Sequence, residues 1–402
     1  MDICFYLHAH QPRRLKDFSI FDVGKEAGYF DESENKRYLR RVIDKSYLPT
    51  NRRLLDLIKK TDGDFKVSFS VTGTLLEQLE RYAPEVITSF QNLYQTGSVE
   101  FISETYYHSL ASIYSPEEFR NQVRLQEEKL EDLFGAKPEV FRNTELAYSN
   151  EVGALVSELG YRGVLTEGAD RVLEWRSPNF VYSFDQDLSL LLKNYRLSDD
   201  IAFRFSEENW SEYPLDASKL ERWISALEGS ADVVNLFMDY ETFGEHQWEQ
   251  TGIFEFLEAF PVEILKNSTN NFVTPSEAFD KNTPKGKLDV PEVISWADTE
   301  RDLSAWQGND LQKSVLKKIY SIEEEVKRNK DSRTLEDWRH LQTTDHFYYM
   351  CTKWFADGDV HKYFNPYNSP YEAYINYVNV LEDLEHRLEN EKERQRVRVK
   401  QN

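Results

Sequence analysis

The stretch Val233-Val234-Asn235-Leu236-Phe237-Met238-Asp239 decides how this chain folds. It is apolar almost throughout and then ends on a carboxylate, which is typical of a strand that is covered on both faces in a parallel sheet. Shorter apolar segments of the same kind recur along the first part of the chain. We expect strands at residues 3–8, 65–71, 99–102, 140–142, 163–166, 233–238 and 272–274.

Helix signals separate these strands. Ser115, Pro116 and Glu118 combine an N-cap, a first-turn proline and a capping-box glutamate, and they predict a helix that runs to Gly135. A second helix is expected from Asn150, its predicted cap, to residue 160. Strands that alternate with helices predict the α/β class, and about seven such units favour a closed barrel over an open sheet. Residues 180–205 are expected to form an inserted β-hairpin region.

After residue 288 the strand signals disappear. Helices are expected at residues 309–330, 335–355 and 370–396. The sequence therefore predicts two parts, a barrel at 1–288 and a helical region at 289–402.

The composition excludes several classes of partner. The chain of 402 residues has a net charge of −22, which opposes binding to nucleic acid and to anionic membrane surfaces. Its two cysteines, Cys4 and Cys351, form no CxxC pair, which argues against a disulfide scaffold or a cysteine zinc site. With no long apolar run and no basic leader segment, we expect a cytoplasmic protein without a transmembrane helix.

Two histidines stand at the end of the first predicted strand. Because side chains alternate along a strand, His8 and His10 share one face with Tyr6, at the barrel end that carries active sites. Two alternatives are a locally hydrogen-bonded pair and a metal-dependent hydrolase or deacetylase that uses His8, His10 and Asp239. The chain has only 8 histidines and no second HxH motif, so we expect neither a metal nor another cofactor.

Carboxylates follow two other predicted strands. Glu145 comes directly after the strand at 140–142, and since Asn150 is the better helix cap, Glu145 has no evident structural role. Asp239 is followed by Glu241 and Glu245, a concentration of negative charge that indicates either catalysis or a hard-cation site.

Two further polar clusters complete the pattern. Residues 97–108 follow a short strand and end on His108. Residues 295–309 interleave Trp296, Asp298 and Trp306 in the segment that joins the two predicted parts. Tryptophans among acidic residues are compatible with a sugar-binding rim, although each one alone is more often a core residue.

Taken together and in this order, the clusters resemble the five characteristic sequence regions of glycoside hydrolase family 57, and most closely those of its α-amylase branch. The matching segments are His10-Gln11-Pro12, the cluster ending at His108, Thr144-Glu145-Leu146-Ala147-Tyr148, Asp239-Tyr240-Glu241-Thr242-Phe243-Gly244-Glu245-His246, and Ser295-Trp296-Ala297-Asp298 with Ser304-Ala305-Trp306. The segment Asp345-His346-Phe347-Tyr348-Tyr349-Met350 also resembles that branch.

This resemblance implies a retaining hydrolase of α-1,4-glucan oligosaccharides or polysaccharides. The implied fold is an incomplete (β/α)7 barrel whose substrate cleft is completed by the C-terminal helical region. A 4-α-glucanotransferase or a branching enzyme of the same family is the alternative. Glu145 would be the nucleophile and Asp239 the general acid/base, with their carboxyl groups ~5–5.5 Å apart. The implied sugar-binding residues are His8, His10, His108, Trp296, Asp298 and Trp306.

General acid catalysis requires a proton on Asp239. The apolar strand that ends at Asp239, together with nearby Glu241 and Glu245, is expected to raise the pKa of its carboxyl group.

Overall fold

The computed structural model describes residues 1–25, 28–329, 331–353 and 365–401. The chain forms two compact units. The first, which we call the barrel unit, consists of residues 1–11, 36–106 and 119–296, and the second, the helical unit, consists of 12–35, 107–118 and 297–402. The sequence predicted a single boundary after residue 288, whereas each unit is built from three separate segments of the chain. The barrel unit extends past that cut because Ile294 pairs with Tyr148 through two backbone hydrogen bonds of 2.9 Å.

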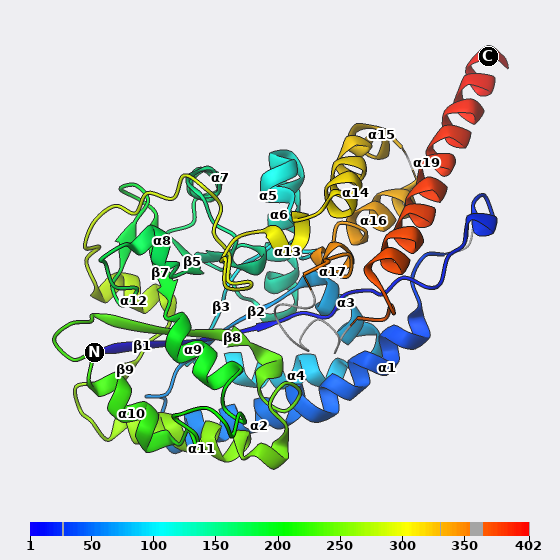
Figure 1. Ribbon diagram of the computed structural model, residues 1–402. Helices are drawn as coiled ribbons and strands as arrows, with labels where there is room; N and C mark the ends of the chain where they lie inside the picture. Colours follow the sequence, from blue (N-terminus) through cyan, green and yellow to red (C-terminus); the bar gives the residue numbers. More distant parts are fainter. Residues whose placement is uncertain (26–27, 330, 354–364, 402) are drawn as a thin grey trace. The chain divides into compact units, whose positions relative to one another are not determined.

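Parallel strands form the centre of the barrel unit (Figure 1). One ladder has the order β3-β2-β1-β8, and a second contains β4-β5-β7. Their bounds are β1 (Asp2–Ala9), β2 (Val67–Val71), β3 (Val99–Phe101), β4 (Val140–Arg142), β5 (Gly163–Glu167), β7 (Ser189–Lys193) and β8 (Val233–Asp239).

Short backbone links join the two ladders at both ends. Ser103, just after β3, pairs with Phe141 of β4, and Asn194, just after β7, donates its N–H to the carbonyl of Asn235 in β8 at 2.9 Å. The strands therefore follow one another around a ring, and the predicted incomplete (β/α)7 barrel is confirmed.

The hairpin expected at residues 180–205 is only partly correct. β6 (Tyr182–Ser183) does pair antiparallel with β7, but β7 also pairs in parallel with β5 and is a strand of the barrel. The remainder of the region is the helix α9 (Tyr195–Ala202). Conversely, the predicted last strand, β9 (Asn271–Phe272), pairs only with the first residues of β1. The local pairing with β6 is thus a hairpin, but the parallel pairing of β7 with β5 was missed.

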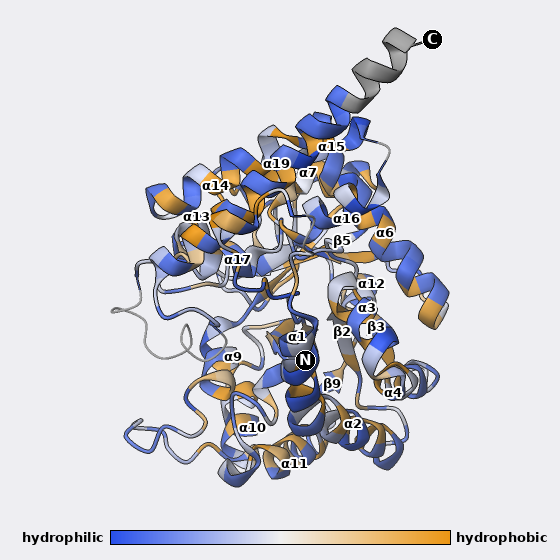
Figure 2. Cartoon of the chain, turned by 90° about the vertical axis from the view of Figure 1, so that its right-hand side faces the viewer, coloured by the Kyte–Doolittle hydropathy of each residue, from blue (hydrophilic) through white to orange (hydrophobic). Residues whose placement is uncertain are grey.

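The strands separate two apolar layers. Phe5, Leu7 and Leu236 belong to the core between the sheet and the surrounding helices, whereas Tyr6 and Phe237 belong to a second core inside the barrel. Helices α2 (Leu48–Lys60), α10 (Ala217–Ser225) and α11 (Ile253–Leu265) lie on one side of β1 and β8 (Figure 1). They mix hydrophobic and hydrophilic residues along their length, as amphipathic helices do (Figure 2).

The predicted helices are largely confirmed. The segment after Ser115 is helical, and the Ser115 hydroxyl accepts the N–H of Glu118 at 3.1 Å. The cap of α7 is Ser149 and not Asn150, because the Ser149 hydroxyl accepts the N–H of Val152, while the side chain of Asn150 bonds Asp289. The other helices before residue 289 are α1 (Glu32–Val42), α3 (Gly73–Tyr82), α4 (Pro84–Tyr94), α5 (Ala111–Tyr114), α6 (Pro116–Phe134), α7 (Asn150–Glu158), α8 (Asp170–Leu173) and α12 (Pro275–Lys281).

In the helical region each of the first two predicted helices is divided. Its helices are α13 (Ser304–Gln307), α14 (Asp310–Ser321), α15 (Glu323–Arg328), α16 (Ser332–His340), α17 (Thr344–Tyr348) and α19 (Pro370–Gln401). The break after α16 has a clear cause, since Thr343 forms an antiparallel bridge with Ser109. The last residues of the predicted helix at 335–355 lie outside the described residues. Among the helices that are described, none has the length and apolar character needed to cross a membrane.

The loop that follows β8 packs tightly against the segment before α2. This segment is a π-helical turn, η2 (Ile43–Tyr47). Gly244 has φ 102°, and a Cβ atom at this position would collide with the backbone carbonyl of Lys45. A left-handed backbone and a close approach both require glycine here.

Replacing Gly244 with Ala should therefore destabilise the protein by roughly 2–4 kcal/mol in urea unfolding, since it adds a backbone collision to conformational strain. Gly252→Ala is the matched control. Gly252 also has a positive φ, of 84°, but its Cβ would meet open space. The control should cost only about 1 kcal/mol. Equal losses for the two variants would contradict the steric account.

Candidate active site

The barrel strands end in polar side chains. On or just after six of the seven barrel strands, an apolar residue of the inner core is followed two positions later by a polar residue; β2 instead has Ser68 and Ser70 on this face. Because alternate residues share a face, these polar groups point toward the same mouth of the barrel. The apolar and polar pairs are Tyr6 and His8, Ile102 and Glu104, Val140 and Arg142, Leu165 and Glu167, Leu191 and Lys193, and Phe237 and Asp239.

His8 contacts three other residues of this polar layer. It pairs in register with Asp239 on the neighbouring strand, and its Nδ1 lies 3.6 Å from Asp239 Oδ1. Its Nε2 lies 3.2 Å from Glu104 Oε2 and 3.3 Å from Arg142 Nη1. The Nε2 atom of His8 is thus close to both a carboxylate and a guanidinium.

His10 lies on the same face as His8, as the alternation of the strand predicted. The two rings stack with their centroids 6.4 Å apart. The Nδ1 atom of His10 is hydrogen-bonded to the hydroxyl of Thr72 at 2.8 Å, which fixes the plane of the ring. His10 is only partly buried.

Glu145 occupies a strained backbone conformation. It has φ 58° and ψ 26°, and the following Leu146 has φ 52°, so two consecutive non-glycine residues are left-handed. Such residues cost of order 1–3 kcal/mol each and persist only where their surroundings hold them. Here Asn143 donates its side-chain N–H to the carbonyl of Ala147 at 2.8 Å across the turn. The capping role considered for Glu145 is excluded because Ser149 caps α7.

Trp296 holds the Glu145 side chain. The indole Nε1 donates to Glu145 Oε2 at 2.7 Å, and the backbone N–H of Trp296 donates to the Glu145 carbonyl at 3.1 Å. The guanidinium of Arg142 and the ammonium of Lys193 lie over the indole ring, at 5.0 Å and 5.3 Å from its centroid. The His8 ring also meets the indole edge to face, with ring centroids 6.1 Å apart. Stacking of Trp296 on a sugar stays a prediction.

The pKa of Asp239 is below its usual range, which corrects the expectation of a raised value. Burial on its own would raise this pKa, but the interactions of Asp239 with His8, His246 and Arg142 outweigh burial and lower it. The Asp239 side chain keeps 39% of its surface exposed. In the free enzyme Asp239 is therefore a carboxylate at neutral pH.

Glu241 is the carboxyl group that keeps a proton. Burial and the negative charge of Asp239 raise the pKa of Glu241 to about 8. Its Oε1 accepts hydrogen bonds from the Tyr47 hydroxyl and, at 3.3 Å, from the side-chain amide of Gln11. Glu245 instead faces Arg41 at 2.7 Å and Lys45 at 3.4 Å. Because these carboxylates have separate partners, they do not resemble a shared hard-cation site.

Three predicted sugar-binding residues belong to the helical unit. The carbonyl of buried His108 accepts the N–H of Thr344 at 2.9 Å. Asp298 has a left-handed backbone with φ 54° and lies 3.8 Å from the ammonium of Lys353. Trp306 is 2% exposed and packs against Tyr348. A sugar could contact the Trp306 ring only if that ring were uncovered.

Four polar residues at the mouth were not singled out from the sequence. They are Glu104, Arg142, Glu167 and Lys193. The signal that could have found them is the alternation itself, since each lies two residues beyond an apolar residue of the inner core. The Lys193 ammonium donates to Asp199 at 2.8 Å and lies 4.0 Å from Glu167. Each of the two buried cations, Arg142 and Lys193, thus lies close to a buried glutamate.

A parallel barrel with two carboxylates after different strands at its C-terminal mouth is typical of a glycoside hydrolase. The model of glycosyl hydrolase family 57 matches residues 4–291. A protein of Methanocaldococcus jannaschii described as a "Putative alpha-amylase" is 42% identical over 398 residues, which cover 96% of this chain and 84% of that protein. The chain belongs to glycosyl hydrolase family 57 and is a glycoside hydrolase.

Solved structures share the fold. A branching enzyme from Pyrococcus horikoshii superimposes with a TM-score of 0.70 at 17% identity, over 98% of this chain and 91% of that protein. A 4-alpha-glucanotransferase from Thermococcus litoralis gives a TM-score of 0.64 at 17% identity, over 86% of this chain and 56% of that longer protein. At these identities the likeness concerns the fold alone.

The raised pKa of Glu241 leads to a prediction about stability. Between the usual glutamate pKa of about 4.3 and the folded value of about 8, the folded state binds more protons than the unfolded state, so stability falls as pH rises. Glu241→Gln removes this contribution. We expect the free energy of unfolding, measured in urea, to fall between about pH 5 and pH 8 in the wild type. In the variant this fall should be smaller by up to about 4 kcal/mol.

The control for this measurement is Glu255→Gln, which changes an exposed glutamate on α11. It should keep the pH dependence of the wild type. If Glu241→Gln shows that same slope, Glu241 is ionised in the folded protein at neutral pH and its assignment as the protonated carboxyl group is wrong.

Proposed function

We propose that this enzyme hydrolyses α-1,4-glucans with retention of anomeric configuration, with Glu145 as nucleophile and Asp239 as general acid/base. The observation that carries the proposal is the restraint on Glu145, whose carboxylate is bonded by the Trp296 indole and whose backbone is strained. A carboxylate held in one position at a barrel mouth is prepared for attack at an anomeric carbon. The 42% identical relative described as an alpha-amylase supports an α-glucan as substrate.

The proposed reaction has two displacements. In the first, Glu145 forms a bond to the anomeric carbon while the glycosidic C–O bond breaks and Asp239 gives a proton to the departing oxygen. In the second, water loses a proton to Asp239 and attacks the same carbon, which releases Glu145 and restores the original configuration. His8, bonded to Asp239 on one ring nitrogen and close to Arg142 on the other, orients that carboxylate.

Sugar binding is proposed for residues of both units. In the barrel unit, His10 presents a partly exposed ring at the mouth. In the helical unit, His108, Asp298 and Trp306 retain their predicted role, with Trp306 requiring exposure of its ring. The substrate is an oligosaccharide or polysaccharide of α-linked glucose.

Product sizing distinguishes hydrolysis from transfer. Incubation with maltoheptaose should yield only shorter maltooligosaccharides, measured by chromatography against size standards. Products longer than the substrate would identify a 4-α-glucanotransferase, and new α-1,6 linkages detected by NMR would identify a branching enzyme. Early time points are the control, because secondary transfer late in the reaction can imitate a transferase.

The mechanism is tested by chemical rescue. Glu145→Ala should lower kcat by on the order of 10³-fold or more, because the covalent intermediate cannot form. Azide should restore part of the turnover and give a β-glycosyl azide, since the small anion attacks from the side that Glu145 occupied. Asp239→Ala is the matched variant, and it should lose least on substrates whose leaving groups need no proton. A first-formed β-anomer from the wild-type enzyme would contradict retention.

A further inference from the structure

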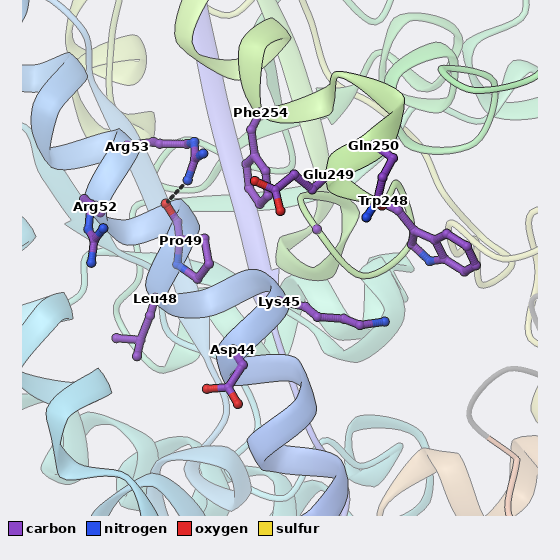
Figure 3. Close-up of a pocket in the computed structure, with 11 residues that line it drawn as sticks. Asp44, Lys45, Leu48, Pro49, Arg52, Arg53, Trp248, Glu249, Gln250 and Phe254 are labelled. Atoms are coloured by element: carbon purple, nitrogen blue, oxygen red, sulfur yellow. Dashed lines mark hydrogen bonds between the residues drawn. The ribbon is translucent and has the colours of Figure 1, made fainter.

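A pocket of about 630 Å³ lies in the barrel unit on the outer side of the loop that follows β8. One wall is formed by η2 and the start of α2, and the other by the segment from Gly244 to Phe254 (Figure 3). Its size falls within the range of ~300–1,000 Å³ that is usual for small-ligand sites. None of the polar residues at the barrel mouth lines this pocket.

An exposed tryptophan stands at the rim. Trp248 keeps 52% of its surface exposed, and the Lys45 ammonium lies 5.6 Å from its ring centroid. Lys45 is in turn anchored by buried Glu245, and the loop between them is held by the close approach at Gly244. The ring is therefore presented by a fixed loop, although exposing a large aromatic surface to water is unfavourable. A flat ring fixed at the rim of a pocket is suited to stacking on a ligand.

The polar lining combines donors with acceptors. Arg52 and Gln250 supply hydrogen-bond donors. Glu249 and Asp44 supply carboxylate acceptors, and Asp44 is also paired with Arg40 at 3.2 Å. Arg53 is already engaged, since it donates to the Pro49 carbonyl at 3.2 Å, pairs with Glu258 at 2.9 Å and lies over the Phe254 ring. The lining holds two carboxylates and three cations, of which Lys45 and Arg53 are paired with acids outside the lining. The hydroxyl groups of a neutral sugar can use both kinds of partner.

The local backbone is also unusual. Asp44 and Lys45 lie in η2, a π-helical turn between α1 and α2. Such turns frequently occur at functional sites, because they displace side chains from the positions that a regular helix would give them. Here the turn brings Lys45 under the Trp248 ring and places Asp44 in the lining.

We propose that this pocket is a second binding site for α-glucan chains, separate from the barrel mouth, with Trp248 as the stacking platform and Asp44, Arg52 and Glu249 as hydroxyl partners. The proposal rests on the proposed α-glucan activity. A second contact on one polysaccharide increases the effective concentration of the chain at the mouth. The site therefore promotes cleavage of glycogen or amylopectin, while an oligosaccharide such as maltoheptaose is cleaved without it.

The test compares variants of the full chain. Trp248→Ala and Arg52→Ala are measured with Trp175→Ala as the matched control, because Trp175 is 87% exposed in the same unit but does not line the pocket. Retardation in native gels containing glycogen reports binding, and kcat/KM is determined separately on glycogen and on maltoheptaose. Trp248→Ala should weaken retention and lower kcat/KM on glycogen by about tenfold, and Arg52→Ala by a smaller factor. Turnover of maltoheptaose should change less than about twofold.

Several outcomes would overturn the site. These are wild-type retention by Trp248→Ala, an equal loss in Trp175→Ala, and a parallel loss of maltoheptaose turnover, which would mean that Trp248 only supports the Asp239 loop. Failure of the proposed function would look different. In that case the wild-type enzyme would cleave neither glucan, although Trp248-dependent retention by glycogen would still establish the pocket as a binding site.

Discussion

The geometry of the barrel mouth depends on the burial of one charged side chain, Arg142. Arg142 is completely buried at the end of β4, where an unpaired cation would cost several kcal/mol. Glu104 supplies the opposite charge, with its Oε2 at 3.4 Å, and His8 and the Trp296 ring surround the same guanidinium. Removing any one of these partners leaves a charge in a poorly solvated place. These contacts connect Arg142 to His8 and Trp296, which in turn contact Asp239 and Glu145, the two proposed catalytic carboxylates.

The two carboxylates are restrained from different sides of this network. Asp239 is held by its register with His8 on the adjacent strand, which is a consequence of the sheet. Glu145 is held by Trp296, in a segment that the short pairing of Tyr148 with Ile294 attaches to the barrel unit. The favourable indole and backbone hydrogen bonds offset the strain of the left-handed turn. Trp296 is in this respect a positioning residue, which explains why a tryptophan precedes the point where the chain leaves the barrel unit.

Hydrophobic periodicity was sufficient to predict six of the seven barrel strands. Buried parallel strands such as β8 are long apolar runs, and every predicted strand coincides with a strand in the structure. The error at β7 arose because a two-residue strand, β6, pairs with it locally, and a sequence cannot reveal that Gly163 is the long-range partner of Ser189. For the mouth, motifs located Glu145 and Asp239, whereas Arg142 and Lys193 carried no motif. Their importance depends on which strands are neighbours in the closed ring.

The pKa of Asp239 was mispredicted for a related reason, and the correction constrains the mechanism. Counting nearby acids in the sequence suggested mutual repulsion, but Glu245 is neutralised by Arg41 and Glu241 keeps its own proton. Of the two neighbouring carboxyl groups Asp239 and Glu241, Asp239 therefore ionises at the lower pH. General acid catalysis nevertheless needs a proton on it, and coupled groups titrate as a pair. A glucan that covers the 39% exposed carboxylate removes water from it, which favours the neutral form. In the proposed mechanism, protonation of Asp239 therefore accompanies substrate binding, and an ionised Asp239 in the structure is compatible with that proposal.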